Sequence, residues 1–322
     1  MGRYVTRRLI QAIPLLVAIS IIVFAIIELA PGDAAQMYID PDKGSDPEYL
    51  AQVRESLGLN RPVYVRYWAW LSRTLQGDLG FSFRTRRPVS LEIGDRLPNT
   101  LLLGGVSLLM SVVIAIPIGI VSALKRYSLL DYVLSTLSLV GISVPVFWVA
   151  LLLLQVFAIR LNWLPGVGMH SVREQYEGWA AVVDVIRHTI LPATVLSLAQ
   201  TASWSRYQRS ALLEVLGQDY IRTARAKGLR ERQVIGIHAL RNALIPTITL
   251  IGLSVPSIVT GAFITETIFG WPGMGRLGVD AINGRDYPII MAVTMLSALL
   301  IVLGNLLADI AYAWADPRIR YD

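Results

Sequence analysis

Chemistry in this chain must come from polar side chains, and their types and spacing match no common catalytic motif. The sequence contains no Walker phosphate loop, no GxSxG, no HExxH and no paired carboxylates in an apolar run. Cysteine is absent, which excludes disulfides and thiolate metal sites. His170 and His188 are interpreted as lacking a second histidine or carboxylate at metal-ligand spacing. We therefore predict no catalytic residue and no metal site.

A glycine-rich stretch near the C-terminal third is the one match to a nucleotide-binding pattern. Gly273, Gly275 and Gly278 fit a dinucleotide-binding fingerprint by letter. That fingerprint needs a preceding strand and a following helix within a βαβ unit, and the pattern here predicts neither. We predict that this stretch binds no nucleotide.

Four polar side chains fall within or at the ends of long apolar runs; they are Gln200, Glu266, Asn305 and Asp309. Such groups are costly in hydrocarbon and usually face the interior of a helix bundle. Two interpretations stay open for each: a hydrogen bond that packs helices together, or a place on a wetted passage for a polar solute. Prolines in or near the same runs break backbone hydrogen bonds, which is tolerated where the backbone lines a cavity. They are Pro14, Pro117, Pro145, Pro192, Pro246 and Pro256.

One strongly basic stretch, residues 219–246, lies between two apolar runs and has the pattern of two short helices. The first covers Tyr220–Lys227 and ends at Gly228, where a left-handed turn has no steric cost. The second is expected to start near Glu231, because an acidic side chain suits the positive end of a helix. A basic loop of this kind often only fixes orientation and contacts anionic lipid. The alternative is a handle for a partner protein.

The elements that position these residues are membrane helices. Of 322 residues, 54% are hydrophobic and 16% are charged, against about 25% charged in soluble domains. The apolar residues occur in long runs, so we predict an all-α membrane protein with six transmembrane helices. Ala115 and Gly119 have the spacing of a close helix contact. The expected spans are 9–30, 100–124, 132–159, 189–204, 244–269 and 287–314.

The first run and the polar stretch after it are interpreted separately. The run follows three arginines as a signal peptide would, but its 22 residues exceed a signal core of about 7–15, so it is predicted to be retained. Residues 31–98 are predicted to form a small, mostly helical extracytoplasmic segment. Its aromatic residues are either anchors at the membrane surface or contacts for a binding protein. They are Tyr64, Tyr67, Trp68 and Trp70.

Lysine and arginine counts predict the orientation. Six spans place both termini on one side, where 15 of these residues lie. With the long segment 31–98 set aside, 5 lie on the other side, and long segments translocate regardless of charge. Both termini are therefore predicted to be cytoplasmic. The predicted domains are 1–30, with the N-terminus and first span, 31–98, and a five-span core, 99–322, containing a cytoplasmic loop, 205–243.

The basic stretch resembles the coupling loop of ABC importer permeases, whose pattern is Glu-Ala-Ala, three residues, Gly, nine residues and Ile-x-Leu-Pro. Ala224, Gly228 and Leu240 match it. The departures are Arg222, Thr223, His238 and Arg241. The amino-acid sequence of this stretch is similar to that of the dipeptide/oligopeptide/nickel branch of the family. Further similar pieces are LAPGDAA at 29–35, SLGLNRPVYVRYW at 56–68, GDLGFSFRTRRPV at 77–89, ISVPVFW at 142–148, EVLGQDYIRTARAKGL at 214–229 and ETIFGWPGMGR at 266–276.

The resemblance implies a type I ABC importer permease fold in a prokaryotic cytoplasmic (inner) membrane. It also implies a second related permease subunit, two cytoplasmic ATPase subunits that bind ATP and Mg, and an extracytoplasmic solute-binding protein. This chain would then hold no cofactor and hydrolyse nothing. In the family, the loop's short helix sits in a groove of an ATPase. The expected coupling residues are Tyr220, Thr223, Ala224, Arg225, Ala226, Lys227, Gly228 and Leu229.

The expected function is that of a permease subunit of an ATP-driven importer, moving peptides inward by alternating access coupled to partner ATPases. Nickel, glutathione and short oligosaccharides stay open as solutes within the same family. A passive channel or membrane scaffold is the alternative from a different class, and it would need no ATPase. A channel pore should show rings of like residues, and no predicted span offers a repeated charged or carbonyl-rich filter.

Overall fold

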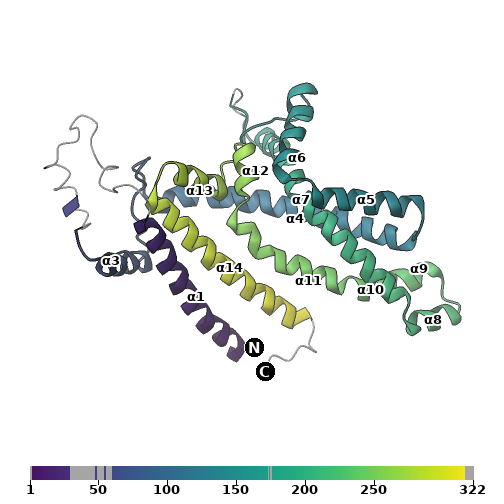
Figure 1. Cartoon of the computed structure of the whole chain (residues 1–322). Helices are drawn as coiled ribbons and strands as arrows, with labels where there is room; N and C mark the ends of the chain where they lie inside the picture. Colours follow the sequence, from purple (N-terminus) through teal and green to yellow (C-terminus); the bar gives the residue numbers. More distant parts are fainter. Residues whose placement is uncertain are drawn as a thin grey trace. The chain divides into compact units, whose positions relative to one another are not determined.

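The computed structural model describes residues 2–29, 48, 54–55, 60–172, 174 and 176–315. These residues are predominantly helical, with one isolated bridge between Phe81 and Pro88. They group into two compact units, one within Met1–Leu97 and Leu277–Val302, the other within Pro98–Arg276 and Leu303–Arg320. Three helices contribute residues to both units (Figure 1): α4 (Val89–Leu124), α13 (Met274–Asn283) and α14 (Tyr287–Ala315). The division predicted from sequence, 1–30, 31–98 and 99–322, stays a prediction.

In the first unit, helix α3 (Val63–Leu75) packs on the membrane helix α1 (Gly2–Leu29). The Tyr67 hydroxyl lies 2.8 Å from the Ser20 hydroxyl, and the Tyr67 and Trp70 rings lie 5.5 and 5.8 Å from the Phe24 ring. These two aromatics therefore pack within the protein. Tyr64 and Trp68 are exposed and keep both interpretations given above. Most of the predicted extracytoplasmic segment before residue 60 lies outside the described residues.

A buried carboxylate ties the loop before α4 to the start of α14. Asp286 accepts hydrogen bonds from the backbone N–H groups of Phe83 at 3.1 Å and Arg84 at 3.3 Å, and from the Ser82 hydroxyl. The Phe83 and Tyr287 rings meet edge to face at 6.3 Å. One side chain thus fixes the loop's path.

Among the described residues, four helices are long and apolar enough to cross a membrane: α1, α4, α7 (Trp179–Leu216) and α14. Two bent pairs also qualify if each is counted as one span, which brings the number to six. They are Leu129–Ser143 with Val146–Arg160 and Glu231–Ala243 with Ile245–Ser254, and the second pair begins before the predicted fifth span. The predicted fourth span, 189–204, lies within α7, which begins ten residues before residue 189. Asp184 and Arg187 lower the hydropathy there, but Ser171 donates to Asp184 and Arg187 donates to the Trp163 carbonyl.

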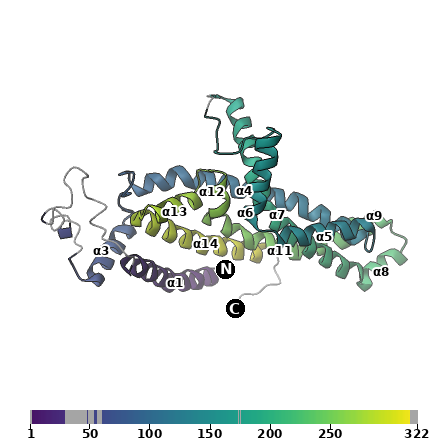
Figure 2. The same cartoon turned by 45° about the horizontal axis from the view of Figure 1, so that its top comes forward.

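The predicted third span, 132–159, is bent and consists of more than one helix. Helix α5 (Leu129–Ser143) and the following helical pair, α6 (Val146–Leu153) with the π-helical turn η2 (Leu154–Arg160), meet at 105° (Figures 1 and 2). The residue before a proline avoids the helical region, and Val144 before Pro145 is extended, with ψ 131°. This proline ends a helix, whereas Pro117 and Pro192 lie inside continuous helices.

The fifth predicted span, 244–269, consists of three pieces. Helix α11 (Ile245–Ser254) passes into a 3₁₀ segment, η4 (Val255–Thr260), and Gly261 turns the chain at φ +76° into α12 (Phe263–Ile268). The close contact predicted for Ala115 and Gly119 is present, because Ala115 is fully buried and Gly119 lies against α7. The second unit is thus built around α7, with α4, α5 and α11 beside it.

Candidate functional site

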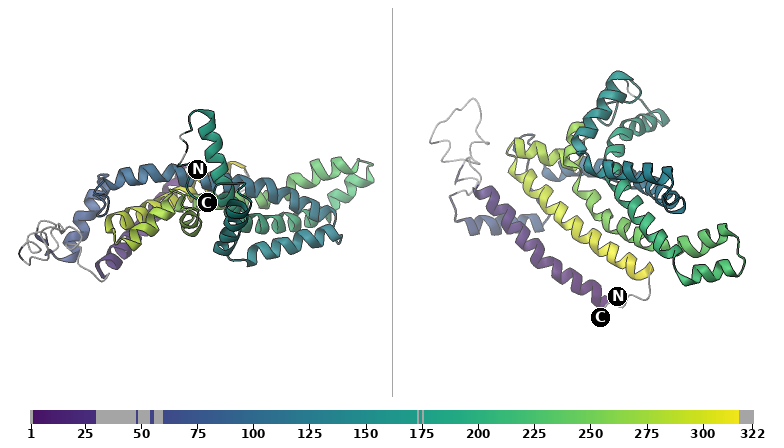
Figure 3. Two further views of the ribbon diagram at one scale, coloured as in Figure 1. Left: turned by 90° about the horizontal axis from the view of Figure 1, so that it is seen from above. Right: turned by 45° about the vertical axis from the view of Figure 1, so that its right-hand side comes forward.

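The basic elbow predicted from sequence forms directly after α7 (the green hairpin in Figure 3). Helix α8 (Asp219–Ala226) starts one residue before the predicted Tyr220. It ends as expected, because Gly228 takes φ +77° and its N–H donates to the Arg225 carbonyl at 2.9 Å. Helix α9 (Glu231–Gln233) begins at the predicted Glu231 and continues through the π-helical η3 (Val234–Ala239) and α10 (Leu240–Ala243). The elbow is an ordered turn between two helical arms.

An ion pair closes the elbow across Gly228. Arg225 donates from Nη2 to Glu231 Oε1 at 2.7 Å and from Nε to Oε2 at 3.2 Å. This bidentate hydrogen bond raises the pKa of Arg225 above its usual value. Arg225 thereby links the end of α8 to the start of α9.

The inner face of α8 is anchored in an apolar cluster, named here the elbow cluster. Ile221 and Ala224 are the buried residues of α8. They pack with buried residues from the end of α4, the end of α7, η3 and α10. These residues are Ala123, Leu212, Val234, Ala239 and Ala243. Because burial of apolar surface holds these elements together, a force on α8 acts on α4 and α7 as well.

The outer face of α8 is open. Of the eight predicted coupling residues, Ala224 alone is buried, and the other seven are exposed: Tyr220, Thr223, Arg225, Ala226, Lys227, Gly228 and Leu229. Arg222 and Arg230 are exposed as well, which makes this face basic. The Tyr220 hydroxyl accepts a hydrogen bond from Asn242 at 3.0 Å. The helix therefore combines an anchored inner face with a free, basic outer face.

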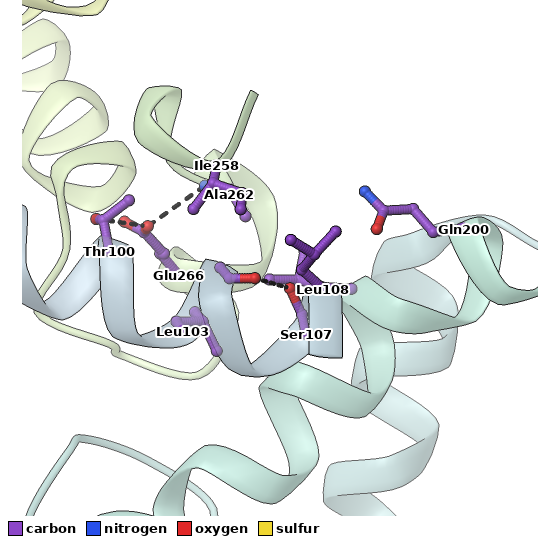
Figure 4. A pocket seen from close by; sticks show the side chains of 10 residues that line it. Thr100, Leu103, Ser107, Leu108, Gln200, Ile258, Ala262 and Glu266 are labelled. Atoms are coloured by element: carbon purple, nitrogen blue, oxygen red, sulfur yellow. Dashed lines mark hydrogen bonds between the residues drawn. The ribbon is translucent and has the colours of Figure 1, made fainter. Parts of the chain in front are cut away.

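Two of the four polar residues predicted in apolar runs line one cavity of about 80 Å³ (Figure 4). Gln200 reaches it from α7, and Glu266 lies at its other side, next to Thr100. The Ser111 hydroxyl lies 3.4 Å from Gln200 Oε1. The remaining lining is mainly apolar and comes from α4, α7, η4 and Ala262 before α12. A cavity of this size has room for a few water molecules.

Glu266 organises the segment around it. It is fully buried and accepts hydrogen bonds from the Thr100 hydroxyl at 3.0 Å, from Ala262 N–H at 3.3 Å and from Arg276 N–H at 3.0 Å. Gly273 lies so close that a Cβ there would be 2.4 Å from Glu266 Oε2. These contacts support the packing interpretation for Glu266, and they explain the glycine at position 273.

A second carboxylate, which the sequence interpretation missed, joins three helices. Asp131 at the start of α5 accepts hydrogen bonds at 2.8 Å from both Nε and Nη2 of Arg209 on α7. It also accepts from the Ser122 hydroxyl on α4 and from Tyr127 N–H at 3.0 Å. The predicted span began at residue 132 and so excluded Asp131. Its position three residues after the helix-capping Ser128 is the signal that could have found it.

Two models of known protein families match this sequence. A model described as a binding-protein-dependent transport system inner membrane component matches residues 115–321. The corresponding N-terminal model matches residues 1–104. The chain belongs to this family of permeases.

Relatives match the permease along its whole length. It is 47% identical over 323 residues to the oligopeptide transport system permease protein AppB of Bacillus subtilis, with 100% of each chain covered. It is 44% identical to a putative peptide permease protein of Brucella suis, with 99% of each covered. It is 41% identical to the glutathione transport system permease protein GsiC of Salmonella choleraesuis, with 100% of each covered.

A solved structure supports the fold. The permease matches a chain of the MetNI methionine ABC transporter, determined in inward-facing conformations, with a TM-score of 0.50 and 16% identity. The match covers 68% of this permease and 96% of that chain. The predicted type I ABC importer permease fold is confirmed, and at this identity the likeness concerns the fold alone.

The remaining predicted residues of the permease lie elsewhere. Asn305 on α14 is exposed, and the side chain of Asp309 lies outside the described residues. The interpretation that His188 has no nearby carboxylate is wrong, because Asp184 lies one turn earlier, 3.3 Å from its Nδ1. Across the described ranges, no group of three or more histidine, aspartate and glutamate side chains could hold a metal ion.

Proposed function

We propose that this permease subunit moves peptides inward through an ATP-driven importer by alternating access. The observation that carries the proposal is helix α8, whose inner face is buried in the elbow cluster and whose outer face is exposed and basic. A helix held this way can receive a push from outside and pass it to the membrane helices. The names of the relatives, which include oligopeptide and peptide permeases, favour peptides as the solute.

The proposed assembly contains four kinds of subunit. A second related permease completes the passage, two cytoplasmic ATPases bind ATP and Mg and hydrolyse ATP, and an extracytoplasmic protein delivers the solute. This chain holds no cofactor in that scheme. Both termini and the elbow lie on the cytoplasmic side in this proposal, which is supported by the excess of lysine and arginine near the span ends.

Force transfer in this scheme follows the contacts of α8. Closure of the ATPases displaces the outer face, with Arg222 and Lys227 among the exposed residues. Ile221 passes the displacement through the elbow cluster to Leu212 on α7 and Ala123 on α4. Because packed interiors are close to incompressible, these helix ends move with α8. The two permeases then alternate between outward-open and inward-open states.

The solute is tested by uptake into proteoliposomes that contain the complete transporter. A labelled oligopeptide should accumulate only with ATP and the solute-binding protein. Excess unlabelled peptide should compete, whereas glutathione, Ni²⁺ and a short oligosaccharide should not. Competition by one of these three instead would replace peptides as the solute. Uptake that needs no ATP would identify a passive channel and overturn the proposal.

The orientation has a direct test, because the chain contains no cysteine. Single cysteines at the exposed positions Arg230 and Val172 can be labelled with a membrane-impermeant maleimide. Arg230→Cys should react only in inside-out vesicles, and Val172→Cys only in right-side-out vesicles. An Arg230→Cys variant that reacts from the outside would place the elbow on the wrong side for any ATPase.

A further inference from the structure

We infer that Asp131 is a positioning residue for transport, whose carboxylate makes α5 move together with the elbow. The inference rests on the coupling function proposed above and deepens it. The Asp131 site comprises Asp131, Arg209, Ser122, Tyr127 and Ser135, and it joins α4, α5 and α7 at one carboxylate. Its role is to transmit displacement; it contacts no solute in the scheme.

The geometry of the Asp131 site makes it rigid. The carboxylate is almost completely buried, with 4% of the side chain exposed, and both of its oxygens accept from the guanidinium of Arg209. A fork-shaped pair of this kind fixes the distance and the angle between the two side chains. Ser135 adds a hydroxyl donor at 3.3 Å from the same helix as Asp131. The start of α5 therefore cannot slide along α7 without breaking charged hydrogen bonds.

The site lies next to the elbow cluster along two helices. Arg209 is three residues before Leu212 on α7, about one helical turn, and Ser122 directly precedes Ala123 on α4. Leu212 and Ala123 are both members of the elbow cluster. No residue of α5 belongs to that cluster in the described structure. The Asp131 site is thus the charged connection that brings α5 to the elbow.

Contacts between α5 and α7 away from the Asp131 site include small and hydroxyl-bearing side chains. Gly141 packs against Ala202, where a Cβ at 141 would lie 3.3 Å from the Ala202 Cβ, and the Ser138 and Ser205 hydroxyls are 3.2 Å apart. Small residues let helices approach closely but offer little shape to lock their register. Charged hydrogen bonds at one end supply the register that these surfaces lack.

A displacement of α5 would be passed through α6 to a second apolar cluster. After the 105° bend, α6 carries Ala150 into a second apolar cluster with Leu191, Val195 and Phe269. This cluster contains the first half of α7 and the segment that follows α12. A connection that moves α5 with the elbow therefore reaches α6 and the opposite end of α7. The Asp131 site thus adds a charged connection to the packing of α5 on α7.

The decisive variant is Asp131→Asn in the complete reconstituted transporter. Asparagine keeps the shape but loses the charge and one acceptor oxygen facing Arg209. ATP hydrolysis should continue, while solute transported per ATP should fall by about tenfold, which lies within the usual range for energetic coupling between two sites. A role in stability alone would lower hydrolysis and uptake together, with their ratio unchanged, and that result would overturn the inference.

Matched variants keep the test specific. Asp95→Asn makes the same change in an exposed pair with Arg87, 3.0 Å away, and should leave the ratio of transport to hydrolysis unchanged. Arg209→Lys keeps the charge without the fork and should give an intermediate ratio. The double variant Asp131→Asn/Arg209→Gln should be no worse than the more affected single variant, because both remove one interaction. If Asp131→Asn fails to accumulate, Arg209→Lys decides, and an unchanged ratio there counts against the inference.

A distance measurement tests the connection without using transport. Spin labels at Leu129→Cys on α5 and Ile237→Cys on η3 occupy exposed positions of a cysteine-free chain. In the otherwise native transporter, the distance between the two labels should show a single peak, at the same value with and without ATP. With Asp131→Asn, the distribution should broaden or shift on ATP binding. Equal, narrow distributions in both proteins would overturn the inference.

Different results would overturn the proposed function and the inference about Asp131. A native transporter that takes up solute without consuming ATP would remove the proposed function and the inference with it. A native transporter that couples normally, with an Asp131→Asn variant that couples equally well, would remove the inference alone.

Discussion

Gly119 of α4 lies so close to Gln208 of α7 that a Cβ at position 119 would be 2.6 Å from the Gln208 Cβ and 2.7 Å from the Ser205 carbonyl oxygen. A methyl group does not fit there unless the two helices separate. We predict that Gly119→Ala destabilises the purified permease by about 1–3 kcal/mol, the usual cost of overpacking. The measurement is the thermal unfolding midpoint in detergent.

Gly105 on the same helix provides the control for this prediction. A Cβ at position 105 would meet no atom within 4 Å. Gly105→Ala should therefore leave the midpoint unchanged or raise it slightly, because alanine favours the helix. Equal midpoints for Gly119→Ala and Gly105→Ala would mean that α4 and α7 do not touch as described.

Substitutions of Gly228 in the elbow can separate the effect of backbone strain from the effect of a steric clash. Gly228 has φ +77°, yet a Cβ there would find open space. Asparagine tolerates this region and valine does not, so Gly228→Asn should retain most coupled uptake and Gly228→Val should lose it. Uptake and ATP hydrolysis are measured together in proteoliposomes. Gly228→Val with native uptake would argue against an elbow that transmits force.

Variants at Glu266 can distinguish a role of this side chain in helix packing from a place on the solute passage. Glu266→Gln replaces one acceptor oxygen by an NH₂ group that faces a backbone N–H, so we predict a loss of about 1–3 kcal/mol. Thr100→Val removes a donor to the same carboxylate and should lower the unfolding midpoint in the same direction. The apparent affinity for solute should stay native in both variants. A changed affinity with a native midpoint would place Glu266 on the solute passage instead.

Asp286 should control the loop before α4. Asp286→Asn weakens acceptance from Phe83 N–H and Arg84 N–H, and it replaces one oxygen by a donor. We predict faster limited proteolysis at residues 82–88, with the membrane helices left intact. Asp78→Asn, in the same loop but hydrogen-bonded only locally to Gly80, is the control and should be cleaved at the native rate. Native cleavage rates in both variants would contradict the prediction.

The sequence predicted features that depend on local pattern. Gly228 and Glu231 were placed correctly, because a helix end and a helix start depend on a few neighbouring residues. The contact at Gly119 was also predicted, because small residues at this spacing serve one purpose in a membrane bundle.

Features that depend on partners distant in sequence were not predicted. The start of α7 was missed because Asp184 reads as a polar interruption until Ser171 supplies its hydrogen bonds. The sharp bend at Pro145 could not be separated from the continuous helix at Pro192, since a proline permits both outcomes. Asp131 and Arg209 lie 78 residues apart, so only the fold reveals that they meet.

The length of α7 has a mechanical consequence. Its 38 residues extend about 57 Å at 1.5 Å per residue, nearly twice the hydrocarbon thickness of about 30 Å. Leu191 in the first half of α7 and Leu212 near its C-terminal end lie in separate apolar clusters. If the helix tilts as one rod about its middle, these ends swing in opposite directions, like a seesaw. A small sideways stroke at the inner end would then narrow one mouth of the bundle while it widens the other.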